Sequence, residues 1–455
     1  MRIRIGNGAG FFGDQIDAPR RLVESTELDY LTLEYLAELT MSILARQKQK
    51  DPTAGYASDF LDVIRSLCPA FQSQTQLRVV TNAGGVNPLA CVKAAAAILQ
   101  SSGMASQMIG VVTGDDLVDR IDVLQTSGCD FQNLDTGEPL SQLSKSIVSA
   151  NAYLGAAPIA EALAADAHLV ITGRVADASL SVGPAVHEFG WTWNDWNRLA
   201  RASVAGHLIE CGAQVTGAYS TTWQGRDLAV VGYPIAELTN DGVVVITKPP
   251  DSGGVVDRHS VVEQLVYEIG DPQHYLTPDV DVDFSTVEVE IEDIDRVRVT
   301  GALGQAPPDT YKVSLAYQNG YTASATLVVM GRDAEEKART CAEIVFTRLA
   351  IAGFEFAKSN VELLGAGDAI PGCSSKRRNG VHEIVLRIAV QDERREAVNR
   401  FRKEIAPLIT SGPAGLAGYA VGRSPLRPVY AYWPTTIPKD CVSTSVEVRT
   451  AKDWL

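Results

Sequence analysis

The sequence lacks the features that mark several large classes of protein. No run of Lys or Arg exceeds three residues and the net charge is −15, which argues against nucleic acid as a partner. No apolar run is long enough to cross a membrane, and Met1–Ile5 is typical of a strand, not of a signal peptide. The seven cysteines include no C-x-x-C pair, as expected of reduced thiols. We therefore expect a cytoplasmic protein without membrane segments.

Fingerprints of nucleotide and redox cofactors are also missing. The glycine-rich stretch 6–10 lacks the full spacing of a dinucleotide-binding loop, and no phosphate-binding P-loop occurs. No ligand spacing of a closed metal site is present either. A divalent metal is still compatible with the carboxylate, imidazole and thiol groups discussed below, and the sequence alone leaves the cofactor unknown.

Apolar strands that alternate with helices dominate the first half of the chain. Four times, near residues 3–5, 77–81, 108–112 and 169–172, an apolar run ends in a Gly-containing polar loop that opens a helix. This alternation predicts an α/β fold with a mostly parallel sheet and covering helices. Ligands in such folds bind beyond the carboxyl ends of the strands, where these four loops would converge.

Alternation with a period of two residues replaces this pattern in the second half. Around Asn319-Gly320 it predicts a β-hairpin. Strands with one polar face and two amphipathic helices indicate an α+β domain, with a ferredoxin-like arrangement as one candidate. We expect an α/β domain at 1–275 that carries the site and an α+β domain at 276–455. Buried apolar helices and a one-sided domain also favour a homo-oligomer.

A predicted helix ending near residue 211 carries the most site-like group of residues. His207, Glu210 and Cys211 stand at i, i+3 and i+4 on one face, so three groups able to move protons or bind a metal lie together. Gln214 adds a polar group just beyond Gly212, which suits a helix C-cap. The alternative is a buried helix in which His207 and Glu210 only hydrogen-bond each other. A Cys211 nucleophile is a further alternative, although side chains on one helix run parallel.

The loops after the apolar strands supply the other candidates. Asp14, in the first loop, is a candidate base or metal ligand. Arg174 and Asp177 follow the strand at 169–172, where a guanidinium beside a helix N-terminus can clamp a carboxylate. A salt bridge between these two residues is the alternative. A metal would draw its ligands from Asp14, Asp177 and the helix at 207–211.

The loop after the strand at 77–81 is a candidate oxyanion site. Asn82 and Asn87 flank Gly84 and Gly85, so amide side chains and backbone N–H groups are available to a negatively charged oxygen. The alternative is that Asn87-Pro88 only starts a helix.

Several stretches carry a further signal, namely 13–17, 81–85, 172–177, 207–217, 233–237, 263–272, 411–419 and 430–434. Together they resemble the acyclic terpene utilisation protein A family. The similarity covers nearly the whole chain, with one departure at Ala218, where a second glycine is expected. The resemblance implies a protein linked to degradation of branched or terpenoid acids, whose intermediates are coenzyme A thioesters, and implies no mechanism.

The reaction class therefore depends on the residues themselves. Carboxylates, a well-placed histidine, an arginine and amide-rich loops suit proton abstraction next to a carbonyl, as in hydration, dehydration or carbon–carbon cleavage. We expect His207 and Glu210 to transfer protons, and Arg174 with the loop at 82–87 to hold the acid or acyl-CoA. The competing hypothesis is a non-catalytic acyl-binding or assembly subunit. In that case His207 and Glu210 would be shielded from solvent and fully hydrogen-bonded.

Overall fold

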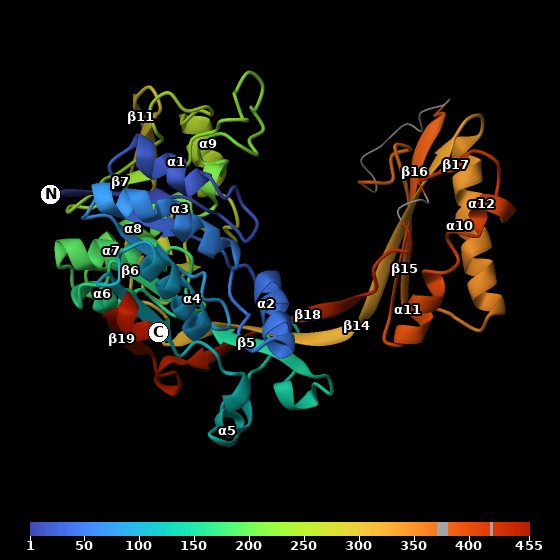
Figure 1. The fold of residues 1–455 in the computed structure, drawn as a ribbon, viewed down its shortest axis with the longest axis horizontal. Coiled ribbons are helices and arrows are strands. Elements are labelled where there is room, and N and C mark those ends of the chain that lie inside the picture. The colour runs from blue at the N-terminus through green and yellow to red at the C-terminus, as the bar shows by residue number, and fades with distance from the viewer. Residues whose placement is uncertain (371–380, 419–421) are drawn as a thin grey trace. The chain divides into compact units, whose positions relative to one another are not determined.

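The computed structural model describes residues 1–370, 381–418 and 422–455, which form two compact units (Figure 1). Unit 1 comprises Met1–Ala316 and Tyr432–Leu455, and unit 2 comprises Tyr317–Ala431. The mixed α/β class expected from the sequence is confirmed. The domain boundary at 275/276 stays a prediction. Strands β11 (Glu288–Asp293) and β12 (Arg296–Thr300) follow this boundary in the sequence and pair within the sheet of unit 1.

The main sheet of unit 1 has ten strands, with a parallel centre and antiparallel flanks. The five central strands pair in parallel in the order β1, β2, β3, β6, β4. Antiparallel strands extend it on both sides, so the expected mostly parallel sheet is correct for the centre and wrong for the flanks. The central strands are β1 (Arg2–Asn7), β2 (Tyr30–Leu33), β3 (Arg78–Thr81), β4 (Met108–Thr113) and β6 (Leu169–Thr172), and the flanking ones also include β7 (Ile235–Thr239), β8 (Val244–Thr247) and β19 (Ser445–Thr450).

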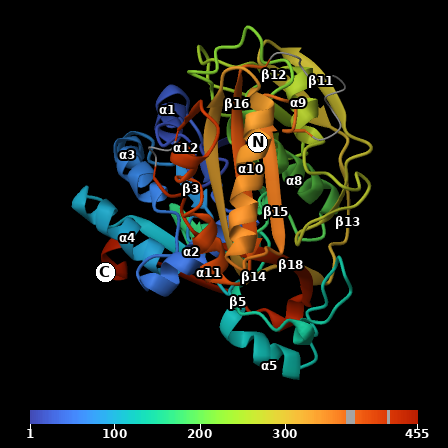
Figure 2. The same cartoon turned by 90° about the vertical axis from the view of Figure 1, so that its right-hand side faces the viewer.

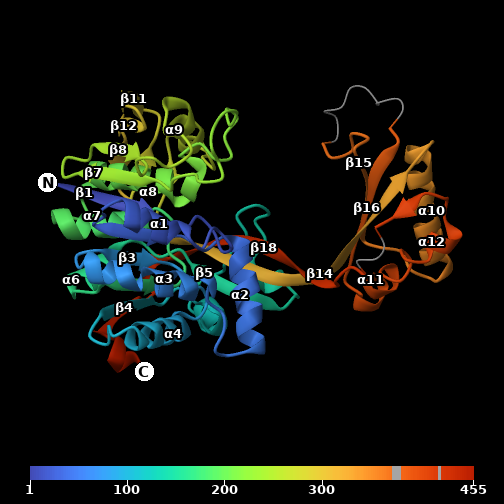
Figure 3. The ribbon, with the colours of Figure 1, turned by 45° about the horizontal axis from the view of Figure 1, so that its top comes forward.

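Two layers of helices cover the central strands. The chain crosses the sheet in one direction from β1 through β2 and β3 to β4, and then turns back to β6. Because crossovers between parallel strands are right-handed, helices in connections that run in opposite directions lie on opposite faces of the sheet. Helices α1 (Ala18–Ser25), α3 (Asp59–Ser73) and α4 (Pro88–Ser101) pack side by side in one layer (Figure 3). Helices α6, α7 and α8 pack against one another in the other layer, and span Ala157–Ala164, Ser179–Phe189 and Trp196–Glu210.

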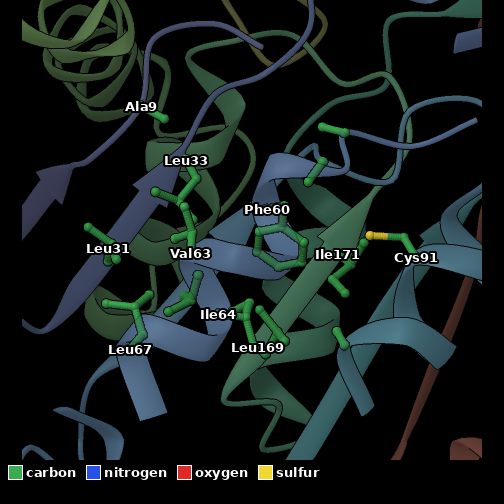
Figure 4. Close-up of a cluster of buried hydrophobic side chains, with 14 of the residues drawn as sticks. Ala9, Leu31, Leu33, Phe60, Val63, Ile64, Leu67, Cys91, Leu169 and Ile171 are labelled. Carbon is green, nitrogen blue, oxygen red and sulfur yellow. The ribbon is translucent and has the colours of Figure 1, made fainter. Parts of the chain in front are cut away.

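The core between α3 and the sheet follows from the sequence pattern of α3. Phe60, Val63, Ile64 and Leu67 recur at the spacing of one helix face, and all four are buried. Figure 4 shows them directed toward apolar side chains of β2 and β6. This packing fixes the carboxyl ends of the central strands, where the candidate residues lie.

Unit 2 contains an antiparallel sheet with the strand order β15-β16-β14-β17. Its elements follow one another as β-α-β-β-α-β, which is the order found in ferredoxin-like folds. Apolar residues of α10 pack on β16, and Figure 2 shows this helix in front of the sheet. The elements are β14 (Thr310–Met330), α10 (Ala334–Ile351), β15 (Lys358–Leu364), β16 (Glu383–Asp392), α11 (Arg395–Phe401) and β17 (Leu416–Ala417).

The hairpin predicted at Asn319-Gly320 is wrong. β14 continues through these residues, because residues 321–330 pair with β16 and not with the preceding segment. Gly320 has a φ of 82° and its Cα lies against the carbonyl of Asp392, so the glycine serves a close approach between strands. Within the described ranges, no helix is long and apolar enough to cross a membrane.

Candidate functional site

Helix α8 approaches the loop after β6 closely because residue 206 is glycine. A Cβ atom at this position would lie 2.8 Å from both the Cα and the carbonyl oxygen of Ala178. Gly206 and Glu210 share one helix face, since they are four residues apart. The contact therefore brings the last turn of α8 toward Asp177.

His207 and Glu210 form a buried pair in that last turn. Nδ1 of His207 lies 3.3 Å from Oε1 of Glu210, and the side chains are only 1% and 8% exposed. Nε2 of His207 lies 3.0 Å from the carbonyl oxygen of Gln264, and the ring packs against Tyr275 and Phe284. Among the described residues, Oε2 of Glu210 has no hydrogen-bond partner. The pair is shielded from solvent, but its hydrogen-bonding capacity is not exhausted.

The surroundings of this pair raise the pKa values of both groups. Burial raises the pKa of Glu210 to about 7, although His207 opposes the shift; the carboxylates of Asp177 and Glu268 add to it. Burial lowers the pKa of His207, but Glu210 and nearby backbone carbonyls outweigh it and raise that pKa overall. Perturbed groups of this kind are typical of acid–base sites.

The loop after β1 packs against the end of α8. The side-chain amide of Asn7 donates to the carbonyl oxygens of Ile209 and Glu210, and a Cβ on Gly10 would lie 2.7 Å from the backbone of Cys211. Asp14 closes this loop, since its carboxylate accepts hydrogen bonds from three donors, namely the hydroxyl of Tyr233 (2.5 Å) and the N–H groups of Gly10 (2.8 Å) and Gln15 (2.7 Å). The structure thus brings Asp14 to the end of α8 in an organising role.

Arg174 is the central cation of the site and is 1% exposed. Its Nη1 donates to the carbonyl oxygen of Leu36 (2.6 Å), its Nη2 pairs with Asp177, and its guanidinium carbon lies 4.2 Å from the ring centre of Tyr153. Nε has no hydrogen-bond partner in the part of the chain that the structure describes. The salt bridge with Asp177, one of the two expected alternatives, is therefore present.

Glu34 follows β2 and is a buried acid beside Arg174. Its Oε1 accepts hydrogen bonds from the backbone N–H of Leu36 (2.7 Å) and from the side-chain amide of Asn82, whose own oxygen accepts from the N–H of Tyr35 (2.8 Å). Burial raises the pKa of Glu34 to about 8, the Asp177 carboxylate adds to the shift, and Arg174 opposes it. Asn82 therefore orients an acid that stays protonated near neutral pH.

Two further carboxylates complete the surroundings of Arg174. Oδ2 of Asp115 accepts from the backbone N–H of Arg174 (2.9 Å) and from the amide of Asn151 (2.8 Å), and burial raises the Asp115 pKa to about 6. Burial opposes ionisation of Glu38, but Lys312 and the hydroxyl of Tyr153 (2.8 Å) lower its pKa to about 2.

Asp177 links the two halves of the site. Its side chain is 34% exposed, in contrast to the buried acids around it. Its charge raises the pKa values of both Glu34 and Glu210, so all three carboxyl groups lie within electrostatic reach of one another. The site thus consists of one partly exposed carboxylate that interacts with two buried acids, and of one buried guanidinium.

Other candidates lie outside this arrangement. The amide of Asn87 donates to the carbonyl oxygens of Pro52 and Ala54 at the start of α4. Gly84 and Gly85 allow close packing, because a Cβ would lie 2.4 Å from the carbonyl oxygen of Thr172 and 2.5 Å from Leu44, respectively. These contacts hold the loop at 82–87 in place, and its role as an oxyanion site stays a prediction.

The last candidates follow the end of α8. Gln214 lies in the 3₁₀ turn Gly212–Gln214. Burial raises the pKa of the Cys211 thiol, which disfavours a thiolate nucleophile there. No cluster of three or more His, Cys, Asp or Glu side chains suited to a metal occurs among residues 1–370, 381–418 and 422–455.

Sequence reasoning missed Glu34, Glu38, Asp115 and Tyr153. Glu34 and Asp115 follow β2 and β4 within two residues, so a search for acids at the carboxyl ends of central strands would have found them. Glu38 and Tyr153 come from α2 (Glu38–Lys50) and from the segment after β5 (Ile147–Ala152), and they meet only in the folded chain.

Comparison with known families matches residues 3–448 to the acyclic terpene utilisation family protein AtuA. The chain belongs to this family. No curated protein and no solved structure matches it. Membership in the AtuA family associates the chain with acyclic terpene utilisation, consistent with a catabolic role.

Proposed function

We propose that this AtuA family member is a catabolic enzyme of the hydratase or lyase type. It would transfer protons next to the carbonyl group of a branched or terpenoid carboxylic acid or of its coenzyme A thioester. The observation that carries the proposal is the pair of buried acids Glu34 and Glu210, whose pKa values burial raises to about 8 and about 7 and which both feel the charge of the partly exposed Asp177. Two acids that titrate near neutral pH suit a proton donor and a proton acceptor.

The roles follow from the contacts of each acid. Glu210 is the base, because the adjacent His207 stabilises its ionised form. Glu34, protonated near neutral pH, is the acid that protonates the substrate oxygen or carbon. His207 acts through Glu210 and is a positioning residue, because its ring is enclosed by Gln264 and two aromatic rings.

Arg174 supplies the positive charge of the site. The net charge of −15 opposes binding of an anionic acid, so a local cation is required. Nη1 and Nη2 of Arg174 bond to Leu36 and Asp177, and Nε, which has no partner within the described chain, is the donor that we assign to a substrate oxygen. Carbonyl polarisation beside a buried cation stabilises the enolate-like charge that proton abstraction creates. The proposal includes a cytoplasmic location and a homo-oligomer, which rest on the sequence alone.

Hydrogen–deuterium exchange at the substrate carbon tests the proposal without knowledge of the full reaction. Thermal shift first selects ligands from branched acids and their thioesters. Each ligand is then incubated with enzyme in D₂O, and deuterium next to the carbonyl is measured by NMR. Wild type should catalyse exchange, and Glu210→Gln should reduce the rate by about 10²-fold or more. The exposed Glu24→Gln is the matched control and should exchange like wild type.

The second candidate is a non-catalytic acyl-binding subunit. The near-complete burial of His207 and Glu210 favours it. It also requires that both groups be fully hydrogen-bonded, whereas Oε2 of Glu210 lacks a partner within the described chain. Ligand binding without any exchange in wild type would support this candidate and refute the enzyme proposal.

A further inference from the structure

Two cysteines that are 312 residues apart in sequence lie in contact within unit 1. The Sγ atoms of Cys129 and Cys441 are 3.7 Å apart, and both residues carry free thiols. Cys129 is buried and Cys441 is partly exposed. Neither belongs to the acid–base site described above.

Backbone and side-chain hydrogen bonds hold the two cysteine-bearing segments together. The N–H of Leu134 donates to the carbonyl oxygen of Pro434 (2.9 Å), and the indole N–H of Trp433 donates to the carbonyl oxygen of Phe131 (2.9 Å). Arg120 donates to the carbonyl oxygen of Cys441 itself (3.0 Å). The thiol contact is therefore a consequence of a fixed local structure on both sides.

We propose that Cys129 and Cys441 are a redox-active pair that forms a reversible intramolecular disulfide with a small disulfide of the glutathione type as oxidant. The hydrogen bond from Cys129 and the nearby Asp440 raise the pKa of Cys441 to about 11, so the attack needs alkaline pH. The partly exposed Cys441 thiolate then attacks the oxidant and releases one small thiol. The Cys129 thiolate then attacks the mixed disulfide at the sulfur of Cys441 and releases the second. The protein loses two protons and two electrons, and the oxidant is reduced to two thiols.

Bond formation requires the two sulfur atoms, now 3.7 Å apart, to approach each other. A disulfide needs an S–S distance of about 2.05 Å, and rotation of the partly exposed Cys441 side chain can shorten the present contact. The bond would join the segment that contains α5 (Ile121–Thr126) to the chain just before β19.

The bond would also lie near the acid–base site. The Cα of Gly114 packs against the carbonyl of Ser443, and the next residue, Asp115, holds the backbone of Arg174. A covalent link would restrict opening of these segments.

The experiment uses the full chain. The protein is treated with oxidised glutathione at mildly alkaline pH, remaining thiols are alkylated, and unreduced peptides are mapped by mass spectrometry. We expect a peptide pair joined through Cys129 and Cys441, an intact mass lower by two hydrogen atoms, a higher Tm, and reversal by dithiothreitol. Cys129→Ser should instead retain one glutathione on Cys441, because the resolving thiol is missing. Cys341→Ser, in the core of unit 2, is the control and should keep the linkage.

Three results would overturn the proposal. These are a wild-type map without the 129–441 linkage, a stable glutathione adduct on wild-type Cys441, and a Cys129→Ser variant that carries no glutathione on Cys441. The wild-type map alone decides the outcome if a serine variant fails to fold.

Discussion

Nδ1 of His207 faces Oε1 of Glu210 at 3.3 Å, while Nε2 of the same ring faces the carbonyl oxygen of Gln264 at 3.0 Å. A carbonyl oxygen can only accept a hydrogen bond, so Nε2 carries a hydrogen. The neutral ring then presents an unprotonated Nδ1 to Glu210, at ion-pair distance from its carboxyl group. This arrangement makes the ring a fixed partner of the acid, set apart from the substrate.

Replacement of His207 by Asn should change the pH dependence of the proposed proton transfer. His207 favours the ionised form of Glu210, so its loss raises the pKa of that acid further. A base with a higher pKa is deprotonated only at higher pH. The acid limb of the exchange rate should therefore move up by about one pH unit. The pH profile of deuterium exchange measures this shift.

The control for that experiment is His259→Asn, an exposed histidine that pairs with Glu263. Its profile should match wild type. If the acid limb of the His207→Asn profile stayed at the wild-type pH, the histidine would not act through Glu210. This holds even if the maximum exchange rate fell.

Replacement of Glu34 by Gln should alter how stability depends on pH. The pKa of Glu34 rises from 4.5 to about 8 on folding, so between these values the folded state holds a proton that the unfolded state releases. Stability from this group is complete below pH 4.5 and is lost as pH rises toward 8. Gln keeps the acceptor for Leu36 and Asn82 but does not titrate. The free energy of unfolding of the variant should exceed that of wild type by about 1–4 kcal/mol across this pH window.

Thermal unfolding from pH 4.5 to 8.5 measures the difference, with the exposed Glu24→Gln as control. A constant difference in stability between Glu34→Gln and wild type over this range would mean that Glu34 is ionised throughout.

The sequence predicted the centre of unit 1 because each signal there is local. Neighbouring residues determine the apolar strands, the glycines that end them and the one-sided pattern of α3. These signals locate the carboxyl ends of the strands, where Arg174 and Asp177 lie. The spacing of His207 and Glu210 is equally local, since one helical turn brings them together.

The remaining features depend on contacts between distant segments. Glu34 becomes a buried acid only because Asn82 and Arg174 approach it from other strands. The Asn319-Gly320 signal for a hairpin failed because ten residues after it found their partners in β16. Local turn chemistry cannot compete with pairing of that length.

Replacement of Arg174 by Lys should destabilise the protein by about 2–4 kcal/mol. Lysine retains the charge, but one ammonium group cannot reproduce the fork that reaches both Leu36 and Asp177 or cover the ring of Tyr153. Urea unfolding measures the change. The control is Arg65→Lys, an exposed arginine paired with Asp62, which should change stability by less than about 0.5 kcal/mol. Equal stabilities of the two variants would contradict the role assigned to the buried guanidinium.

Replacement of Gly206 by Ala separates helix propensity from packing, because the two effects have opposite signs. Alanine favours a helix interior over glycine by about 1 kcal/mol, so an unconstrained site would be stabilised. At position 206 the new methyl group would lie 2.8 Å from two backbone atoms of Ala178, which cannot rotate away. Overpacking of this kind costs about 1–3 kcal/mol, so we expect a net loss of stability.

The same substitution should weaken the site. Moving α8 away from Ala178 increases the separation between Glu210 and Asp177, so the Glu210 pKa should fall toward its usual value and exchange should slow. Gly270→Ala is the control, because no described atom lies within 4 Å of a Cβ at that position, and it should leave both Tm and exchange near wild type. If Gly206→Ala raised the Tm instead, the close approach of α8 to the loop after β6 would be incorrect, and with it the placement of Glu210 beside Asp177.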